Sequence, residues 1–294
     1  ERTIFPIADN AEPIVAIASD PELTSTSLQI FYKHDVTPDA YKQSPDYWMS
    51  QYVLNLISQM QINRLQELTQ KPNPPFVGGY SYFGDYYLAP TKAAWTSYAM
   101  PKDNASIEEA LTALVVENKR MQQHGFTASE YERAKADFMK RVESAYNERN
   151  NTENEKHVDA CLEHFLHNEP MMDIETEYQL YQQVIPNLPL EAINAFAAQL
   201  IREDNLVITL TAPQKEGETL PTEEELLAMY NKAYAMEVEA YEEEVFEGPM
   251  IAKLPKAGKV KKESFNETFG TTEWILSNGM KVIFKQTTFK DDEI

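Results

Sequence analysis

The chain alternates between stretches with a two-residue apolar period and stretches with a helical period. Apolar and polar residues alternate within 26–33, which predicts a half-buried strand. Over 44–68 the apolar residues recur at steps of three and four, with one eight-residue gap, which predicts one face of a long amphipathic helix. These residues are Trp48, Tyr52, Val53, Leu56, Met60 and Leu68. A proline-rich turn at 71–75 should end this helix, because proline lacks a backbone N–H.

Two aromatic-rich stretches, 76–83 and 92–100, are bounded by turn residues and predict neighbouring antiparallel strands. From Ser106 onwards the chain is helical in pattern for about a hundred residues. Thr127 and Glu130 have the spacing of a capping box within this region. A β-branched strand returns at 205–211. Strands, then helices, then a strand predict an α+β fold, with helices on one face of an antiparallel or mixed sheet.

The composition changes after Pro213. Eleven glutamates and a single lysine lie between Glu216 and Glu247, and a lysine-rich stretch follows. Apolar residues at helical steps predict an acidic helix over 222–245. The Asn-Gly pair at 278–279 lies between apolar runs and predicts a β-hairpin over 272–285.

Charge and composition exclude several function classes. The 26 basic and 47 acidic residues give a net charge of −21, which argues against binding to nucleic acid phosphates. No apolar run approaches the roughly 18 residues of a membrane-spanning helix. The nine glycines form no phosphate-binding fingerprint, no G-x-S-x-G elbow is present, and the single cysteine excludes an intramolecular disulfide.

Residue types that ligate metals gather in one predicted helix: His157, Cys161, His164 and His167. The first three share one helix face, and Glu163 adjoins them. The inverted zinc motif H-x-x-E-H would need histidine at position 160, where the chain has Ala160. We therefore assign no metal ligand and no catalytic residue, and we interpret Cys161, Leu162 and Phe165 as ordinary helix core.

The Gly78-Gly79 pair suggests a binding edge. Glycine weakens a strand interior unless another backbone approaches closely. The segment could therefore bind a peptide by adding it as a further strand. Its residues are Phe76, Val77, Gly78, Gly79 and Tyr80. The alternative is a bulge or bend that follows the proline-rich turn.

Four segments carry a resemblance to a known family. Residues 20–30, 63–68 and 76–79 resemble the second domain of the M16 (insulinase/pitrilysin) zinc metallopeptidases. Residues 270–282 resemble the L-x-N-G-[LM]-x-V strand pair that opens M16 repeats. The resemblance covers nearly the whole chain.

The resemblance implies a particular organisation. Long M16 peptidases form two halves, each of two related α+β domains, and these halves enclose a chamber. Zinc binds in the first domain, on H-x-x-E-H and a distal glutamate. Here residues 1–215 would be a noncatalytic M16-like domain, 216–262 an acidic then basic linker, and 263–294 the truncated first strands of the next domain. Both ends look cut from a longer chain.

The resemblance also implies a function. The chain would supply chamber wall and, along Phe76–Tyr80, border an exosite for the N-terminal part of a substrate. Its partners would be a peptide or small protein substrate and the catalytic M16 domain of the same chain, with zinc in that domain and no cofactor here. Similar long chains suggest a periplasmic bacterial setting. The alternative is a catalytically inactive M16-like scaffold subunit. An intact H-x-x-E-H upstream would favour the peptidase.

Overall fold

The computed structural model describes residues 3, 5–215, 217, 219–243, 248, 251 and 253–288. The chain forms two compact units, Glu1–Tyr241 and Glu242–Ile294. The strands of the first unit are β1 (Ile14–Asp20), β2 (Ser27–Asp35), β3 (Gly78–Asp85), β4 (Lys92–Met100) and β5 (Leu206–Pro213). Its α-helices are α1 (Asp39–Lys42), α2 (Pro45–Thr69), α3 (Ile107–His124), α4 (Ala128–Asn147), α5 (Asn154–His167), α6 (Ile174–Val184), α7 (Leu190–Ala197) and α8 (Glu223–Tyr234).

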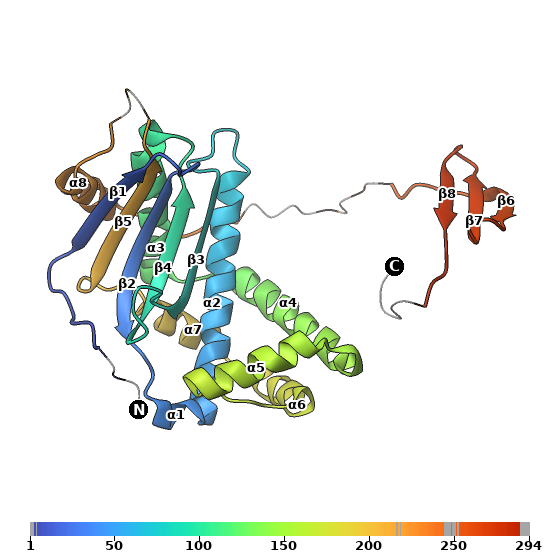
Figure 1. The fold of residues 1–294 in the computed structure, drawn as a ribbon, viewed down its shortest axis with the longest axis horizontal. Helices are drawn as coiled ribbons and strands as arrows, with labels where there is room; N and C mark the ends of the chain where they lie inside the picture. The colour runs from blue at the N-terminus through green and yellow to red at the C-terminus, as the bar shows by residue number, and fades with distance from the viewer. Residues whose placement is uncertain are drawn as a thin grey trace. The chain divides into compact units, whose positions relative to one another are not determined.

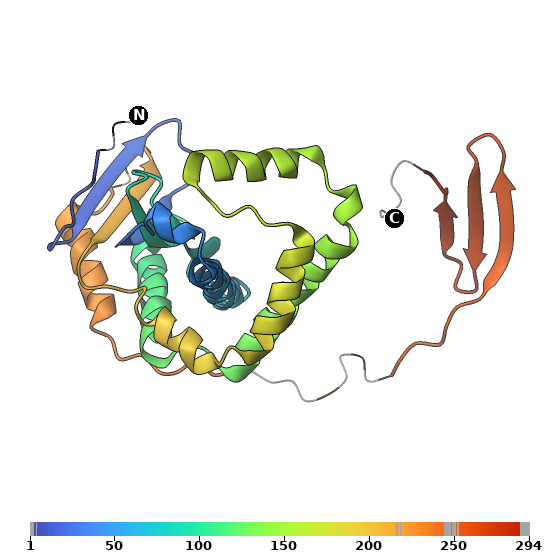
Figure 2. The ribbon, with the colours of Figure 1, turned by 90° about the horizontal axis from the view of Figure 1, so that it is seen from below.

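The strands of the first unit form a mixed sheet in the order β1-β5-β2-β4-β3. Strand β1 runs parallel to β5, and the other neighbours are antiparallel. Helices α3, α7 and α8 lie on one side of this sheet, and α2 runs beside β3 (Figures 1 and 2). The predicted α+β fold is confirmed. Strand β1 is an element that the sequence pattern did not reveal.

The core lies between the sheet and these helices. Alternate residues of β2, Leu28, Ile30 and Tyr32, join it with the fully buried Trp95 of β4. The Tyr32 hydroxyl bonds the Tyr230 hydroxyl of α8 at 2.9 Å, which identifies the helix-covered side of the sheet. The two-residue period in 26–33 therefore placed the correct side chains in the core.

Local chemistry explains where the main helices begin. Ser44 caps α2 by accepting the Tyr47 N–H, and Pro45 occupies the first turn, where no helical N–H partner is needed. The predicted capping box of Thr127 and Glu130 opens α4. Glu130 also bonds Arg64 of α2 through Nε–Oε1 at 2.6 Å, and both side chains are buried. The Glu130 carboxylate thus caps the start of α4 and also links α4 to α2.

Helix α8 is shorter than the helix predicted over 222–245. It ends at Tyr234. Lys119 of α3 donates to the carbonyl oxygens of Tyr234 and Met236, both at 2.6 Å. Val238 is buried, and its carbonyl oxygen bonds His124 at 2.7 Å. These bonds satisfy carbonyls that a longer helix would pair internally, so the chain leaves α8 along the end of α3. Residues 244 and 245 lie outside the described residues.

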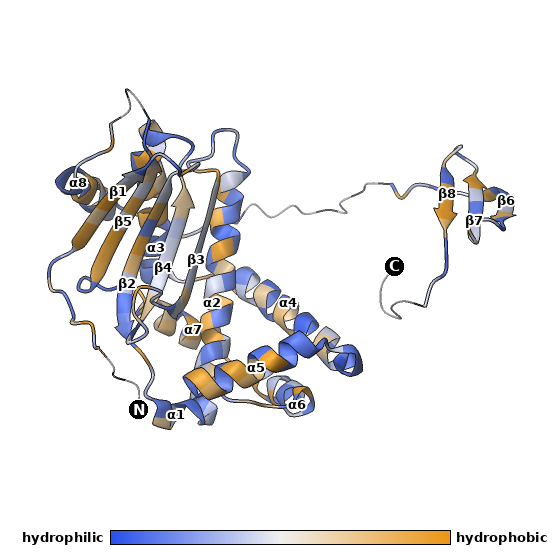
Figure 3. Ribbon diagram, in the orientation of Figure 1, coloured by the Kyte–Doolittle hydropathy of each residue, from blue (hydrophilic) through white to orange (hydrophobic). Residues whose placement is uncertain are grey.

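Helix α5 corrects the core interpretation of Cys161, Leu162 and Phe165. The helix has no buried residue, Cys161 is exposed, and Phe165 is 82% exposed. Its hydrophobic residues are visible in Figure 3. The anchoring contacts lie at its C-terminal end, where Lys42 donates to the His167 carbonyl oxygen at 2.6 Å. A helical spacing of apolar residues predicts a face that could be buried, but no other described element covers the apolar face of α5.

The second unit contains a three-stranded antiparallel sheet in the order β6-β7-β8. Its strands are β6 (Val260–Asn266), β7 (Thr271–Leu276) and β8 (Lys281–Phe284). Strands β7 and β8 confirm the predicted hairpin, and Gly279 in its turn has φ of 88°, which favours glycine. Strand β6 was not predicted, and it crosses the proposed boundary between 262 and 263.

Candidate functional site

The face of the sheet opposite the core is covered by none of the described helices, and we call it the open face. Four of its side chains form a row across neighbouring strands. In order they are Tyr80, Tyr98, Gln29 and Thr209. The Tyr80 ring stacks on Tyr98 with 4.8 Å between centroids. Burial, with neighbouring Tyr82 and Tyr98, raises the pKa of the Tyr80 phenol above its ordinary value.

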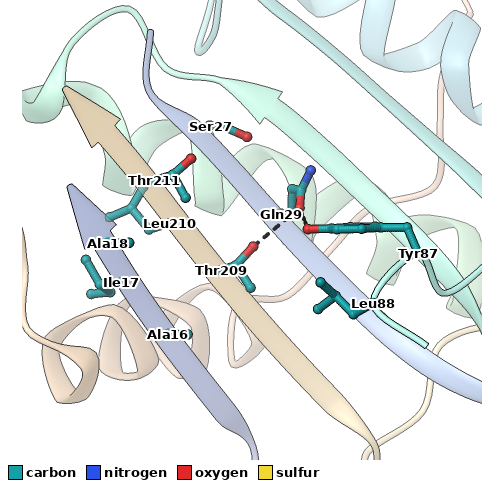
Figure 4. Close-up of a pocket in the computed structure, with 10 residues that line it drawn as sticks. All are labelled: Ala16, Ile17, Ala18, Ser27, Gln29, Tyr87, Leu88, Thr209, Leu210 and Thr211. Atoms are coloured by element: carbon teal, nitrogen blue, oxygen red, sulfur yellow. Dashed lines mark hydrogen bonds between the residues drawn. The ribbon is translucent and has the colours of Figure 1, made fainter. Parts of the chain in front are cut away.

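A hollow of about 300 Å³ lies on the open face over β1, β5 and β2 (Figure 4). Gln29 lies at its floor, where its Oε1 accepts from the Tyr87 hydroxyl at 3.0 Å and from the Thr209 hydroxyl at 3.4 Å. The small side chains of Ala16 and Ala18 leave room along β1. Among the described residues that line the hollow, none is charged. The full lining is Ala16, Ile17, Ala18, Ser27, Gln29, Tyr87, Leu88, Thr209, Leu210 and Thr211.

The loop between β3 and β4 supplies the rim of the hollow. Tyr86 in this loop is buried, and its ring meets that of Phe31 edge-on at 5.3 Å. Tyr87 and Leu88 follow it and are exposed by 62% and 54%. The buried residue holds the loop on the sheet, so the exposed pair stands at the edge of the hollow.

The predicted binding segment runs into β3, which begins at Gly78 and is an edge strand of the sheet. The Phe83 N–H points away from β4 and donates to Ser58 of α2 at 3.3 Å. Because backbone N–H groups alternate in direction along a strand, Gly79 and Ser81 share this outward phase. Ser81 is buried, so of these two residues only the partly exposed Gly79 presents its N–H at the strand edge, and Ser58 closes the edge at Phe83.

The five predicted residues have different environments. The Phe76 side chain is fully buried, while Val77 and Tyr80 are exposed. Val77 precedes β3 and donates its N–H to Met100 at 2.8 Å. A Cβ at Gly79 would lie 2.9 Å from the Phe76 ring and 3.1 Å from the Tyr98 carbonyl oxygen, whereas one at Gly78 would meet open space. Packing within the chain thus accounts for Gly79, and Gly78 has no such constraint.

The described residues contain no group of three or more His, Cys, Asp and Glu side chains that could hold a metal ion. His157, Cys161 and His164 lie on α5 and are exposed. Two isolated histidines instead bond backbone carbonyls: His34 bonds Leu200 at 3.0 Å and His124 bonds Val238. No helix in the described part of the chain combines the length and apolar character that a bilayer crossing needs.

Sequence reasoning missed Gln29, Thr209 and Tyr87. Thr209 is 180 positions from Gln29 along the chain, and only the pairing of β2 with β5 brings them together. The alternation in 26–33 does place Gln29 opposite the core residues. That signal locates a polar side chain on the open face, although it does not reveal its neighbours.

The chain was compared with known protein families, sequences and structures. No protein-family model matches the chain. A protein described as zinc protease PQQL-like, from Arabidopsis thaliana, is 25% identical over 296 residues, covering 99% of this chain and 27% of that protein. The crystal structure of the periplasmic protease PqqL from Escherichia coli matches with a TM-score of 0.70 and 18% identity, covering 99% of this chain and 32% of that one.

A predicted insulinase family protease from Yersinia pestis matches with a TM-score of 0.64 and 14% identity, covering 80% of this chain and 49% of that one. The chain has the M16 peptidase fold. The expected resemblance to the M16 family is thereby confirmed. The chain spans about a quarter of the length of the Arabidopsis relative and about a third of PqqL.

Proposed function

We propose that this chain is a noncatalytic, substrate-enclosing domain of a longer zinc-dependent M16 endopeptidase. This proposal rests on the observation that 99% of the chain matches only 27% of a protein described as zinc protease PQQL-like. The sequence also has no H-x-x-E-H motif. Zinc would then bind in the catalytic M16 domain of the same protein, and this domain would form chamber wall around a peptide or small protein. The likeness to a periplasmic protease favours a periplasmic location.

Within this function we propose an exosite at Phe76–Tyr80, where the edge of β3 pairs with the main chain of an extended peptide. The outward N–H of the partly exposed Gly79 supports main-chain pairing, and the open space at Gly78 leaves room beside it. Phe76 would act by supporting the edge from below, because its side chain is buried. The bond from Phe83 to Ser58 limits pairing to a short segment.

Elemental analysis of this chain and of the full-length protein tests the enzymatic part. We expect zinc near one equivalent in the full-length protein and none in this chain. Zinc in neither would favour the inactive scaffold and overturn the peptidase proposal. One equivalent of zinc in this chain would overturn its noncatalytic role.

The exosite is tested with a fluorescein-labelled extended peptide and fluorescence anisotropy on this chain. N-methyl groups placed at alternate peptide residues remove either the N–H groups that face β3 or those that face away. We expect one alternation to weaken binding at least tenfold and the other to leave it unchanged, since strand pairing uses every second residue. Equal effects from both sets would contradict strand addition.

A further inference from the structure

We propose that the hollow on the open face is a second substrate subsite, which takes an uncharged aromatic side chain, with tyrosine preferred, from a peptide held at the β3 edge. This inference rests on the proposed exosite and names the substrate class that the same face selects. Its basis is the shape, the polarity and the position of the hollow.

The volume and walls fit an aromatic ring. The hollow measures about 300 Å³, and Ala16, Ala18 and Leu88 supply apolar surface around it. Aromatic side chains gain most from such partly apolar sites because they bury a large area at a small cost in conformational entropy. A charged side chain would lose hydration without an opposite charge in the described lining, which disfavours it.

The Gln29 side chain at the floor of the hollow favours a ligand group that accepts a hydrogen bond. Tyr87 and Thr209 both donate to Gln29 Oε1, which orients the amide and occupies its acceptor. Gln29 Nε2 has no hydrogen-bond partner among the described residues, so its N–H groups remain available to a ligand. A phenol oxygen accepts such a bond, whereas the indole N–H of tryptophan only donates. The floor therefore favours tyrosine over phenylalanine and tryptophan.

The position of the hollow links it to the β3 edge. Tyr80, Tyr98 and Gln29 are aligned across three neighbouring strands. Strands lie about 4.8 Å apart, so Gln29 is roughly 10 Å from β3 and roughly 15 Å from a strand added beyond it. An extended chain spans about 3.3 to 3.6 Å per residue. A tyrosine four to five residues beyond the paired segment would therefore reach the hollow across the stacked Tyr80 and Tyr98 rings.

Fluorescence anisotropy on this chain tests the subsite with one peptide series. Each peptide carries the same edge-binding segment, a Gly-Ser spacer of one to eight residues, and a terminal tyrosine, phenylalanine or glutamate. We expect tyrosine to improve the affinity about tenfold at spacers of four to five residues, with a smaller gain for phenylalanine and none for glutamate. A gain that is independent of spacer length or residue type overturns the subsite.

Two protein variants test whether the affinity gained from the peptide tyrosine depends on the hollow. Ala16→Phe fills the hollow and should abolish the gain while leaving the affinity of the edge segment alone unchanged. Gln29→Leu should remove the preference for tyrosine over phenylalanine, and Gln66→Leu, at an exposed position of α2, is the matched control that should keep it. A tyrosine preference that survives both hollow variants overturns the proposal.

The same series separates the two proposals. If the edge segment binds and the tyrosine adds nothing, the subsite is refuted and the exosite stands. If neither the edge segment nor the longer peptides bind, the exosite and the subsite are both refuted.

Discussion

The two faces of the five-stranded sheet use polar side chains in opposite ways. On the covered face, Asn118 of α3 accepts from the Trp95 indole at 3.0 Å and donates to Ser97 at 2.9 Å, and Ser81 completes the network at 2.8 Å from Ser97. On the open face, Gln29 receives two hydroxyl donors and keeps its own amide N–H groups available.

The difference follows from what lies above each face. A buried polar group without a partner costs about 1–3 kcal/mol, so Asn118, Ser97 and Ser81 on the covered face pair with one another. The open face can leave donors exposed, because water satisfies them until a ligand does. We therefore expect substitutions on the covered face to change the free energy of unfolding, and those on the open face to change binding.

The largest expected effect on stability is that of Trp95→Ala. It removes a fully buried indole and one of the two donors to Asn118 Oδ1, which keeps the Ser97 hydroxyl, so the free energy of unfolding should fall by about 4 kcal/mol. Urea denaturation measures this. Tyr80→Ala on the open face is the control and should cost at most about 1 kcal/mol; equal losses would remove the distinction between the faces.

Glu130→Ala should have the next largest effect, about 3 kcal/mol, because it leaves the buried Arg64 guanidinium without its carboxylate. The loss is moderated because Arg64 keeps a bond to the Gly125 carbonyl oxygen at 2.9 Å and packs on the Phe126 and Tyr241 rings. Replacing exposed Glu132 by alanine is the matched control and should change stability by less than about 0.5 kcal/mol.

The glycine pair gives a smaller contrast within two adjacent positions. Gly79→Val should cost about 2 kcal/mol, because its Cβ would collide with Phe76 and approach the Tyr98 backbone. Gly78→Val should change the free energy of unfolding by less than about 0.5 kcal/mol, since its Cβ meets open space. Thermal unfolding of both variants measures the difference, and similar losses would contradict the packing explanation for Gly79.

The smallest effect is a pH dependence at His34. Burial lowers the pKa of this ring, while its bond to the Leu200 carbonyl oxygen opposes the shift. The unfolded chain therefore binds a proton first as the pH falls below about 6.5, so the contribution of neutral His34 to stability is present above this pH and is lost below it. The stability advantage of the wild type over His34→Gln should shrink between pH 7.5 and 5.5. A constant difference would show that the pKa is not lowered.

One part of the candidate site was predicted from the sequence and another part was not. The Gly78-Gly79 segment was predicted from sequence because glycines inside an aromatic strand are a local anomaly. The Phe76 contact at Gly79 could not be predicted, since it depends on how the turn after α2 packs. The hollow could not be predicted either, because Thr209 is 180 positions from Gln29 along the chain and the sequence pattern did not reveal β1, which carries Ala16.

Interactions within a few residues set the periods, the caps and the turns, and these predict α2, β4, the start of α4 and the hairpin of β7 and β8. Which apolar faces are covered depends on the packing of segments that are distant along the chain. Helices α3 and α5 both have helical apolar periods, yet α3 packs beneath the sheet and α5 has no buried residue. The physical reason is that a local pattern sets the direction of a side chain, whereas burial requires a second surface, which long-range strand pairing brings to α3 and not to α5.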